Sequence, residues 1–427
     1  MDAMVREDID YLLTKPNFSR LMKKRAEVTH VRSVYPSNTY PAHTSILTGC
    51  NPGKHGIRTN TPLKTYDDHY PHWYLYCKSI RTEDLFAAAK RAGCTTASVF
   101  WPITGCNPNI DHIIDEYFLF FKEENPLETF ARLGADEVAI EAIRENLSLL
   151  PHRDSETRKL NRDFDDFIMG CTCSLIRNAQ PDVLLVHNCR LDTLRHSNGV
   201  FNEAVTAGLD QTDLWLGDVI HAMEDAGVYE NTNFVILSDH GQMDLSRKVS
   251  LNALLAQEGF IVLAPDGQLY DWRAFAQSGG MSAAVYLDDP ENKDLYQHVQ
   301  AYLQKLVDEK VWGFTKVYTI PELLEKYGTY GPFSFMVATD GQTAVLENLT
   351  GPALTQIDLS DCRTGSATHG YEPELGPQPV FLGRGPAFKE GAVLAQARLI
   401  DEAPTLARIL GQEMSQAEGH CLEELLK

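Results

Sequence analysis

Two short runs of apolar residues stand out along the chain. Val183–Val186 and Phe234–Leu237 are continuously apolar rather than alternating with polar positions. This pattern is typical of strands buried on both faces, as in a parallel sheet covered by helices. A later apolar run, Pro379–Leu382, predicts a further strand.

Longer segments between these runs have helical periodicity. The predicted helices are Phe18–Lys24 with Asn17 as its N-cap, Thr82–Ala92 ending at Gly93, Val205–Ala226, and Asp294–Val307. Strands that alternate with helices predict an α/β fold, with a central, mostly parallel sheet flanked by helices.

Two regions depart from this alternation. Residues from about 255 to 345 contain turn clusters such as Pro265-Asp266-Gly267, which predict a smaller lobe inserted beside the sheet. Residues from about 107 to 165 combine charge with helical pattern and predict a helical insertion. Because neither an internal repeat nor a low-complexity linker occurs, residues 1–427 are expected to form a single domain.

The charge composition argues against two classes of binding partner. With 38 basic and 59 acidic residues, the formal charge is -21, which argues against a nucleic-acid surface and against docking on anionic membranes. Bound metal ions would let so acidic a protein hold a phosphate locally. No apolar run is long enough to span a membrane. The start, MDAMVREDID, lacks signal-peptide features, and the nine cysteines form no Cys-x-x-Cys pair, so a cytoplasmic protein with reduced thiols is expected.

Aspartate and histidine follow the predicted strands. Phe234–Leu237 leads through Ser238 into Asp239 and His240, and Asp192 and His196 have the i, i+4 spacing that places both on one side of a helix. His369 precedes the late apolar run. Each segment alone is more often a turn, a cap or a solvated helix face. Their joint occurrence at strand ends favours a ligand site, and the mixture of carboxylate and imidazole suits zinc.

A threonine between two prolines offers a nucleophile. In Pro36-Ser37-Asn38-Thr39-Tyr40-Pro41-Ala42-His43, the hydroxyl of Thr39 would be a poor nucleophile at neutral pH unless a metal ion activated it. The alternative for this segment by itself is an ordinary turn bracketed by prolines.

In this order, the segments resemble the alkaline phosphatase superfamily, and most closely its nucleotide pyrophosphatase/phosphodiesterase branch. PSNTYPAHTSILTGCNPGKHGIRTN is similar to the nucleophile motif and the asparagine that follows it, and SDHG, the Asp-x-x-x-His turn and THGY match the remaining metal motifs. The resemblance implies an alkaline-phosphatase-like fold, two Zn²⁺ ions as cofactors, and a hydrolase that cleaves phosphodiester or pyrophosphate bonds of nucleotide-type small molecules through a covalent phospho-threonine.

The resemblance also assigns roles to individual residues. Thr39 matches the nucleophile, which also contacts a metal; Asn60 matches the residue that binds a phosphoryl oxygen; and Tyr40 matches the aromatic residue that stacks on a base. The metal ligands carried over are Asp192, His196 and His369 for one zinc, and Asp2, Asp239 and His240 for the other.

One departure concerns the start of the chain. The family's first strand precedes the aspartate that Asp2 matches, and Ala3 stands where the family has glycine. Two explanations remain open: the natural start lies upstream of Met1, which we favour and which leaves room for an export signal, or the second metal site is crippled.

Other activities of the superfamily remain open. The pattern Thr-x-Pro-x-His does not fit a sulfatase, which needs Cys or Ser and an arginine in that motif. Phosphonoacetate hydrolases and phosphomonoesterases stay as alternatives, and a catalytically inactive binding protein is a further one. The oligomeric state is not predicted.

Overall fold

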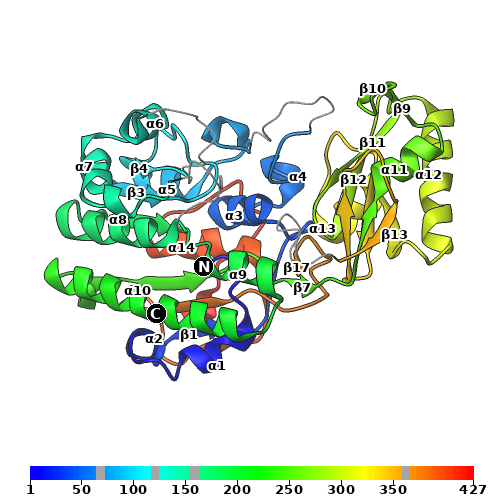
Figure 1. The fold of residues 1–427 in the computed structure, drawn as a ribbon. Helices are drawn as coiled ribbons and strands as arrows, with labels where there is room; N and C mark the ends of the chain where they lie inside the picture. The colour runs from blue at the N-terminus through cyan, green and yellow to red at the C-terminus, as the bar shows by residue number, and fades with distance from the viewer. Residues whose placement is uncertain (64–72, 117–124, 153–162, 358–365) are drawn as a thin grey trace.

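The protein is described by a computed structural model at residues 1–63, 73–116, 125–152, 163–357 and 366–427. Two lobes are visible in Figure 1, a larger α/β lobe and a smaller lobe built around an antiparallel sheet. The predicted insertion at about 107–165 includes residues outside the described ones, at 117–124 and 153–162.

The larger lobe contains two main sheets. In one, β4 (His112–Ile114), β3 (Thr96–Val99) and β5 (Val183–Val186) run parallel. In the other, β18 (Phe381–Arg384) lies antiparallel between β1 (Ala26–Val28) and β6 (Phe234–Leu237), and β19 (Val393–Leu394) is parallel to β1. The lobe is therefore α/β, as predicted. The sheet of β3, β4 and β5 is entirely parallel, whereas the other sheet is mixed because β18 runs antiparallel to both of its neighbours.

Helices and short ladders complete this lobe. The helices are α1 (Ile9–Leu12), α2 (Pro16–Met22), α3 (Thr39–Thr48), α4 (Pro52–His55), α5 (Leu85–Arg91), α6 (Pro126–Arg132), α7 (Glu137–Glu145), α8 (Asp165–Asn178), α9 (Arg190–Asn198), α10 (Glu203–Asp225) and α14 (Glu402–Ile409). The two-stranded ladders are β2 (Val31–Arg32) with β20 (Ala397–Arg398), and β7 (Met243–Asp244) with β17 (Ala367–Thr368).

The smaller lobe has an antiparallel sheet of strand order β11-β12-β14-β13. Its strands are β11 (Ala274–Ser278), β12 (Ser282–Leu287), β13 (Phe314–Thr319) and β14 (Phe335–Thr339). Around it lie α11 (Leu251–Gln257), α12 (Lys293–Asp308), α13 (Ile320–Tyr327), β8 (Arg247–Ser250), β9 (Ile261–Leu263), β10 (Leu269–Trp272), β15 (Thr343–Leu346) and β16 (Leu354–Gln356). The apolar side chains of this lobe form a core of their own.

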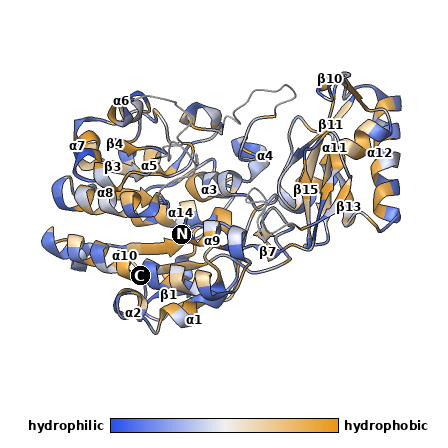
Figure 2. Ribbon diagram, viewed as in Figure 1, coloured by the Kyte–Doolittle hydropathy of each residue, from blue (hydrophilic) through white to orange (hydrophobic). Residues whose placement is uncertain are grey.

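The predicted strands and most helices are found close to their expected bounds. The two apolar runs are β5 and β6, residue for residue, and Figure 2 shows β6 in hydrophobic colours between α8 and α10. The helix α10 begins after Asn202 and α12 after Asn292, because each asparagine side chain accepts a backbone N–H of the first turn.

Two predicted helix starts are wrong. The helix α2 begins at Pro16, and Asn17 lies inside it with its amide donating to the carbonyl oxygen of Asp213, so Asn17 is not the N-cap. The helix α5 begins at Leu85 rather than Thr82, because the carboxylate of Asp84 accepts the N–H of Ala87 and fixes the first turn there.

The first residues of the chain lie inside the larger lobe (Figure 1). The amino group of Met1 donates to the carbonyl oxygen of Leu237 at 3.0 Å. The N–H of Asp2 donates to the carbonyl oxygen of Asn188 at 2.9 Å. Ala3 follows with φ 52°, in the left-handed region that favours glycine. Among the described residues, none of the helices combines the length and the apolar character that crossing a membrane requires.

Replacing Ala3 by glycine is expected to stabilise the protein by about 1 kcal/mol, because an L-residue with a Cβ is strained in the left-handed region. Denaturant unfolding measures this change. Ala87→Gly, inside α5, is the matched control, and there the same substitution should destabilise by about 1 kcal/mol. Equal effects of the two variants would contradict strain at Ala3.

Candidate active site

The ends of two apolar strands bring most of the predicted ligands together. Asp239 and His240 follow β6 after Ser238, and α9, which begins shortly after β5, carries Asp192 and His196. The ladder of β7 with β17 then places His369 beside the segment that follows His240. Sequence positions that are far apart thus meet at one edge of the larger lobe.

The first group of ligand atoms comes from Asp2, Asp239 and His240, whose side chains are buried. The Nε2 atom of His240 lies 3.0 Å from Oδ2 of Asp239 and 3.7 Å from Oδ1 of Asp2. Burial, followed by repulsion from Asp239, raises the pKa of Asp2 well above its ordinary value. Burial also opposes the charged form of Asp239, but the nearby imidazoles of His240 and His43 outweigh it and hold the pKa of Asp239 low.

The second group surrounds Asp192. Its Oδ1 atom lies 3.4 Å from Nε2 of His196 and 4.0 Å from Nε2 of His369. Ligand atoms of Asp192, His240 and His369 also lie within 4.8 Å of one another, and the rings of His240 and His369 are stacked with centroids 4.1 Å apart. The two groups are therefore contiguous, and His240 belongs to both.

Backbone carbonyls fix how two of the imidazoles present their nitrogens. Nδ1 of His196 lies 2.8 Å from the carbonyl oxygen of Ala367, and Nδ1 of His240 lies 3.2 Å from that of Gly241. A carbonyl only accepts hydrogen bonds, so Nδ1 carries the proton in each neutral ring. The lone pair of Nε2 then faces the carboxylates, as a metal-binding histidine requires.

The protonation state of the buried histidines also suits a metal ion. Burial, reinforced by the neighbouring imidazoles of His240 and His196, holds the pKa of His369 well below its ordinary value. Burial likewise lowers the pKa of His240, although the carboxylate of Asp239 opposes the shift. The lowered pKa values favour the neutral form of both rings, which is the form that binds a metal through nitrogen.

Two carboxylate oxygens show that this donor set fits a cation. Oδ1 of Asp2 and Oδ2 of Asp239 are buried and have no hydrogen-bond partner among the described residues. A buried, unpaired carboxylate oxygen is costly, and a divalent cation compensates that cost. Carboxylate oxygen together with imidazole nitrogen is a combination that binds zinc and other transition-metal ions.

The predicted nucleophile lies beside these ligands. Thr39 is the first residue of α3, and its Oγ1 atom is 3.2 Å from Nε2 of His240. The amide oxygen of Asn60 accepts the backbone N–H of Tyr40 at 3.0 Å, which leaves the Nδ2 end as the donor that Asn60 can offer a phosphoryl group. The N-terminal end of α3 adds a partial positive charge that favours an anion here.

The ring of Tyr40 is too buried to stack on a base in this structure. Its ring is 1% exposed, its hydroxyl donates to the carboxylate of Glu116, and its face is tilted against Trp73 with ring centroids 5.1 Å apart. In this position the ring is packed among apolar side chains and is not open to a base.

Residues beside the ligands hold them in place, and sequence reasoning missed this role for Asn38 and Gln242. The amide oxygen of Asn38 accepts from Nδ1 of His369 at 2.9 Å, and Gln242 donates its amide to Oδ1 of Asp192. His187 contacts Oδ2 of Asp2 at 3.1 Å through Nε2. Asn38 and Gln242 adjoin the motifs, and this adjacency is the signal that could have found them.

His187 takes part in a further group of ligand-type atoms. Asp2, His187 and Cys189 offer atoms within 4.8 Å of one another. Because Asp2 also belongs to the group with Asp239 and His240, its carboxylate lies between the two sets. Burial holds the pKa of His187 well below its ordinary value, which favours the neutral ring here as well.

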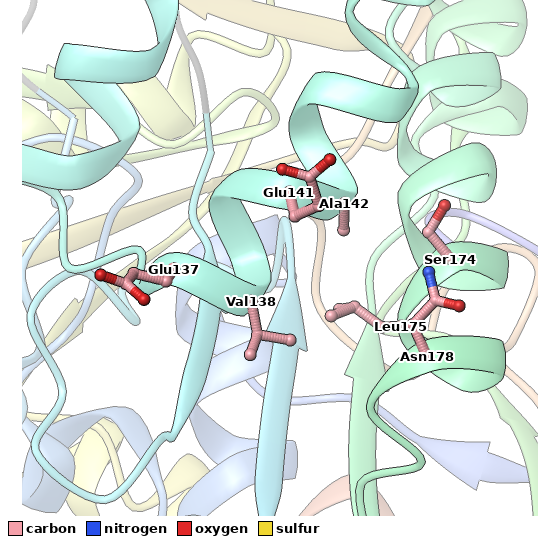
Figure 3. A pocket seen from close by; sticks show the side chains of 7 residues that line it. All are labelled: Glu137, Val138, Glu141, Ala142, Ser174, Leu175 and Asn178. Atoms are coloured by element: carbon pink, nitrogen blue, oxygen red, sulfur yellow. The ribbon is translucent and has the colours of Figure 1, made fainter.

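A separate hollow of about 290 Å³ lies between α7 and α8 (Figure 3). Its lining residues are Glu137, Val138, Glu141, Ala142, Ser174, Leu175 and Asn178. They include neither imidazole, thiol nor basic side chain, and the hydroxyl of Ser174 accepts the amide of Asn146. This hollow has no set of groups that would activate a nucleophile.

Comparison with known proteins agrees with the geometry. A sequence profile of the type I phosphodiesterase / nucleotide pyrophosphatase family matches residues 1–372. The chain belongs to this family. The predicted membership is thereby confirmed.

Individual relatives of this phosphodiesterase family are distant in sequence. Ectonucleotide pyrophosphatase/phosphodiesterase family member 1 of Mus musculus is 23% identical over 93% of the chain, and the chain spans 38% of the length of that relative. The bis(5'-adenosyl)-triphosphatase of Homo sapiens, family member 4, is 21% identical over 93% of the chain and is covered over 74% of its length.

Solved structures share the fold. An inactive variant of murine ectonucleotide pyrophosphatase / phosphodiesterase 5 in complex with AMP superposes with a TM-score of 0.64 and 19% identity, covering 100% of this chain and 98% of the other. The human counterpart has the same TM-score of 0.64. The predicted alkaline-phosphatase-like fold is confirmed by this likeness.

Proposed function

We propose that this phosphodiesterase family member is a two-zinc hydrolase that cleaves phosphodiester or pyrophosphate bonds of nucleotide-type small molecules through a covalent phospho-threonine. The observation that carries the proposal is the position of Thr39, at the first residue of α3 and 3.2 Å from a ligand nitrogen of His240. Two relatives support it: human family member 4 is named as a bis(5'-adenosyl)-triphosphatase, and the inactive murine variant carries alanine in place of a threonine.

The residues present would hold two zinc ions in two groups. Asp2, Asp239 and His240 would hold one ion, and Asp192, His196 and His369 the other, as the resemblance implies. When bound, such ions supply the positive charge that lowers the pKa of a hydroxyl group and stabilises oxygens that become negative.

The chain's own residues account for the remaining steps. Thr39 Oγ1 attacks the phosphorus and loses its proton, a new O–P bond forms, and the bond to the leaving oxygen breaks as that oxygen takes up a proton. Water then attacks the same phosphorus, which restores the hydroxyl and releases the phosphate product. The Nδ2 group of Asn60 and the N-terminal end of α3 stabilise negative charge on the phosphoryl oxygens.

The substrate class is tested with zinc-loaded protein and chromogenic esters. We expect the p-nitrophenyl ester of thymidine 5'-monophosphate to be cleaved well above p-nitrophenyl phosphate, and EDTA to remove the activity until zinc is returned. Monoester preference would indicate a phosphatase, and turnover of phosphonoacetate alone would indicate the phosphonate branch. Inactivity toward all three would overturn the hydrolase proposal.

Replacing Asn60 by alanine is expected to lower kcat/KM for the diester about a hundredfold, as when one donor to a developing oxyanion is removed. Asn60→Asp is the matched variant, because it keeps an oxygen for the N–H of Tyr40 but has no donor. Steady-state kinetics should show both variants impaired. Wild-type activity in Asn60→Asp would mean that Asn60 only positions Tyr40.

A further inference from the structure

Two arginines beside the candidate active site have no carboxylate partner within the described part of the chain. Arg58 belongs to the loop that leads from α4 to Asn60. The side chain of Arg81 lies against Gly56 of the same loop, so closely that a Cβ atom at Gly56 would come within 2.9 Å of its Cδ and Nε atoms. Neither guanidinium belongs to an ion pair of the described residues, although acidic residues outnumber basic ones by 59 to 38. Two neighbouring cations without counter-charge in so acidic a chain make a candidate anion site.

Backbone carbonyls hold the guanidinium of Arg58 in a fixed position. It donates to the carbonyl oxygens of Gly56 at 2.9 Å and Gly53 at 3.4 Å in the larger lobe. It also donates to the carbonyl oxygen of Tyr330 in the smaller lobe. These bonds use three of the five N–H groups, and they leave the positive charge unpaired because carbonyls are neutral. The remaining N–H groups are held ready for a ligand, which lowers the entropy lost on binding.

The side chain of Tyr74 lies close to both arginines. Burial raises the pKa of Tyr74, and the charges of Arg58 and Arg81 oppose this shift. Burial, followed by repulsion from Arg81, lowers the pKa of Arg58, so the two guanidinium groups repel each other. An anion bound by both would remove this repulsion, and the phenol of Tyr74 would offer it a further donor.

These side chains adjoin the segment that carries the phosphoryl-binding asparagine. The N–H of Tyr74 donates to the carbonyl oxygen of Asn60 at 3.3 Å. The ring of Tyr74 packs against the apolar cluster that contains Ile57 and Tyr40, the residue after the nucleophile. A group held by the arginines would therefore belong to the same small molecule as the phosphorus that Thr39 attacks.

We propose that Arg58, Arg81 and Tyr74 form a subsite for a second phosphate group of the substrate, distinct from the phosphate that reacts. Guanidinium groups supply the planar, charge-assisted donors that phosphate oxygens accept in pairs. The preferred substrate would then carry at least two phosphates rather than a single diester phosphate. This subsite deepens the proposed function and rests on it for the position of the reacting phosphate.

Calorimetric titration without turnover tests the subsite. Zinc-loaded Thr39→Ala protein is titrated with thymidine 5'-monophosphate, thymidine 5'-diphosphate and thymidine 3',5'-bisphosphate. The last two probes place the second phosphate on the leaving side and on the nucleoside side of the reacting one. Binding is measured without chemistry, so a failed subsite and a failed hydrolase proposal can be told apart.

Three substitutions are compared in this background. Arg81→Gln is the main variant, because Arg81 is exposed whereas Arg58 joins the two lobes. Tyr74→Phe removes only the phenol. Lys78→Gln removes the same charge from an exposed side chain of the same segment and is the matched control.

We expect one of the two doubly phosphorylated probes to bind at least about tenfold more tightly than the monophosphate, as an additional charge-assisted contact provides. Arg81→Gln should abolish this preference, Tyr74→Phe should reduce it, and Lys78→Gln should retain it. Equal affinity for all three probes would overturn the subsite, as would a preference that survives Arg81→Gln or is lost equally in Lys78→Gln. If the preference is found but the protein with Thr39 does not turn over the diester, the subsite stands and the hydrolase proposal fails.

Discussion

Thr39→Ala is expected to lower turnover of the diester substrate about ten-thousandfold or more, because the attacking oxygen is removed while the ligand set stays intact. Rapid-quench labelling should show phosphorylated protein in the wild type and none in the variant. The zinc content of Thr39→Ala, measured by mass spectrometry under native conditions, should equal that of the wild type.

Two matched variants separate chemistry from packing. Thr39→Ser keeps a hydroxyl at the start of α3 and should retain a measurable part of the activity. Thr48→Ala removes a buried hydroxyl that bonds to the Thr44 carbonyl in the same helix, and it should leave kcat nearly unchanged. If Thr39→Ala turned over the diester at the wild-type rate, a covalent threonine mechanism would be ruled out.

The second large effect is expected from the carboxylate of Asp239. Asp239→Asn keeps the shape of the side chain but removes the charge that faces His240 and His43. Loss of one metal ion should lower activity about a thousandfold or more and should reduce the bound zinc from two ions to one per chain. Activity assays and native mass spectrometry measure the two quantities on the same sample.

Asp244 provides the control for this substitution. It follows shortly after in β7, and its Oδ1 atom accepts the N–H of Val200 rather than facing the ligands. Asp244→Asn should therefore keep both zinc ions and most of the activity. Two zinc ions retained by Asp239→Asn would remove Asp239 from the ligand set.

Local patterns were enough to predict the strands that carry the site. β5 and β6 are apolar at every position because both faces are covered, and the ligands lie within a few residues of the ends of these strands. The i, i+4 pair on α9 is likewise a property of a single helix. Motif order then identified the family.

What the sequence did not reveal depends on contacts between distant segments. The burial of Tyr40 follows from its hydrogen bond to Glu116, and the contiguity of the two ligand groups follows from the stacking of His240 on His369. The antiparallel position of β18 between β1 and β6 is also set by contacts between segments that are far apart in the sequence. A pattern of a few residues carries no information about such partners.

The spread of the ligands along the chain has a consequence for unfolding. Asp2 and His369 enclose most of the sequence, and Asp192 and Asp239 lie between them, so a bound metal pair closes several long loops at once. Cross-links that close long loops restrict the unfolded ensemble most, in the manner of a disulfide network. Bound zinc would then stabilise the larger lobe as a whole against unfolding. Resistance to proteolysis should therefore increase with the fraction of chains that hold metal.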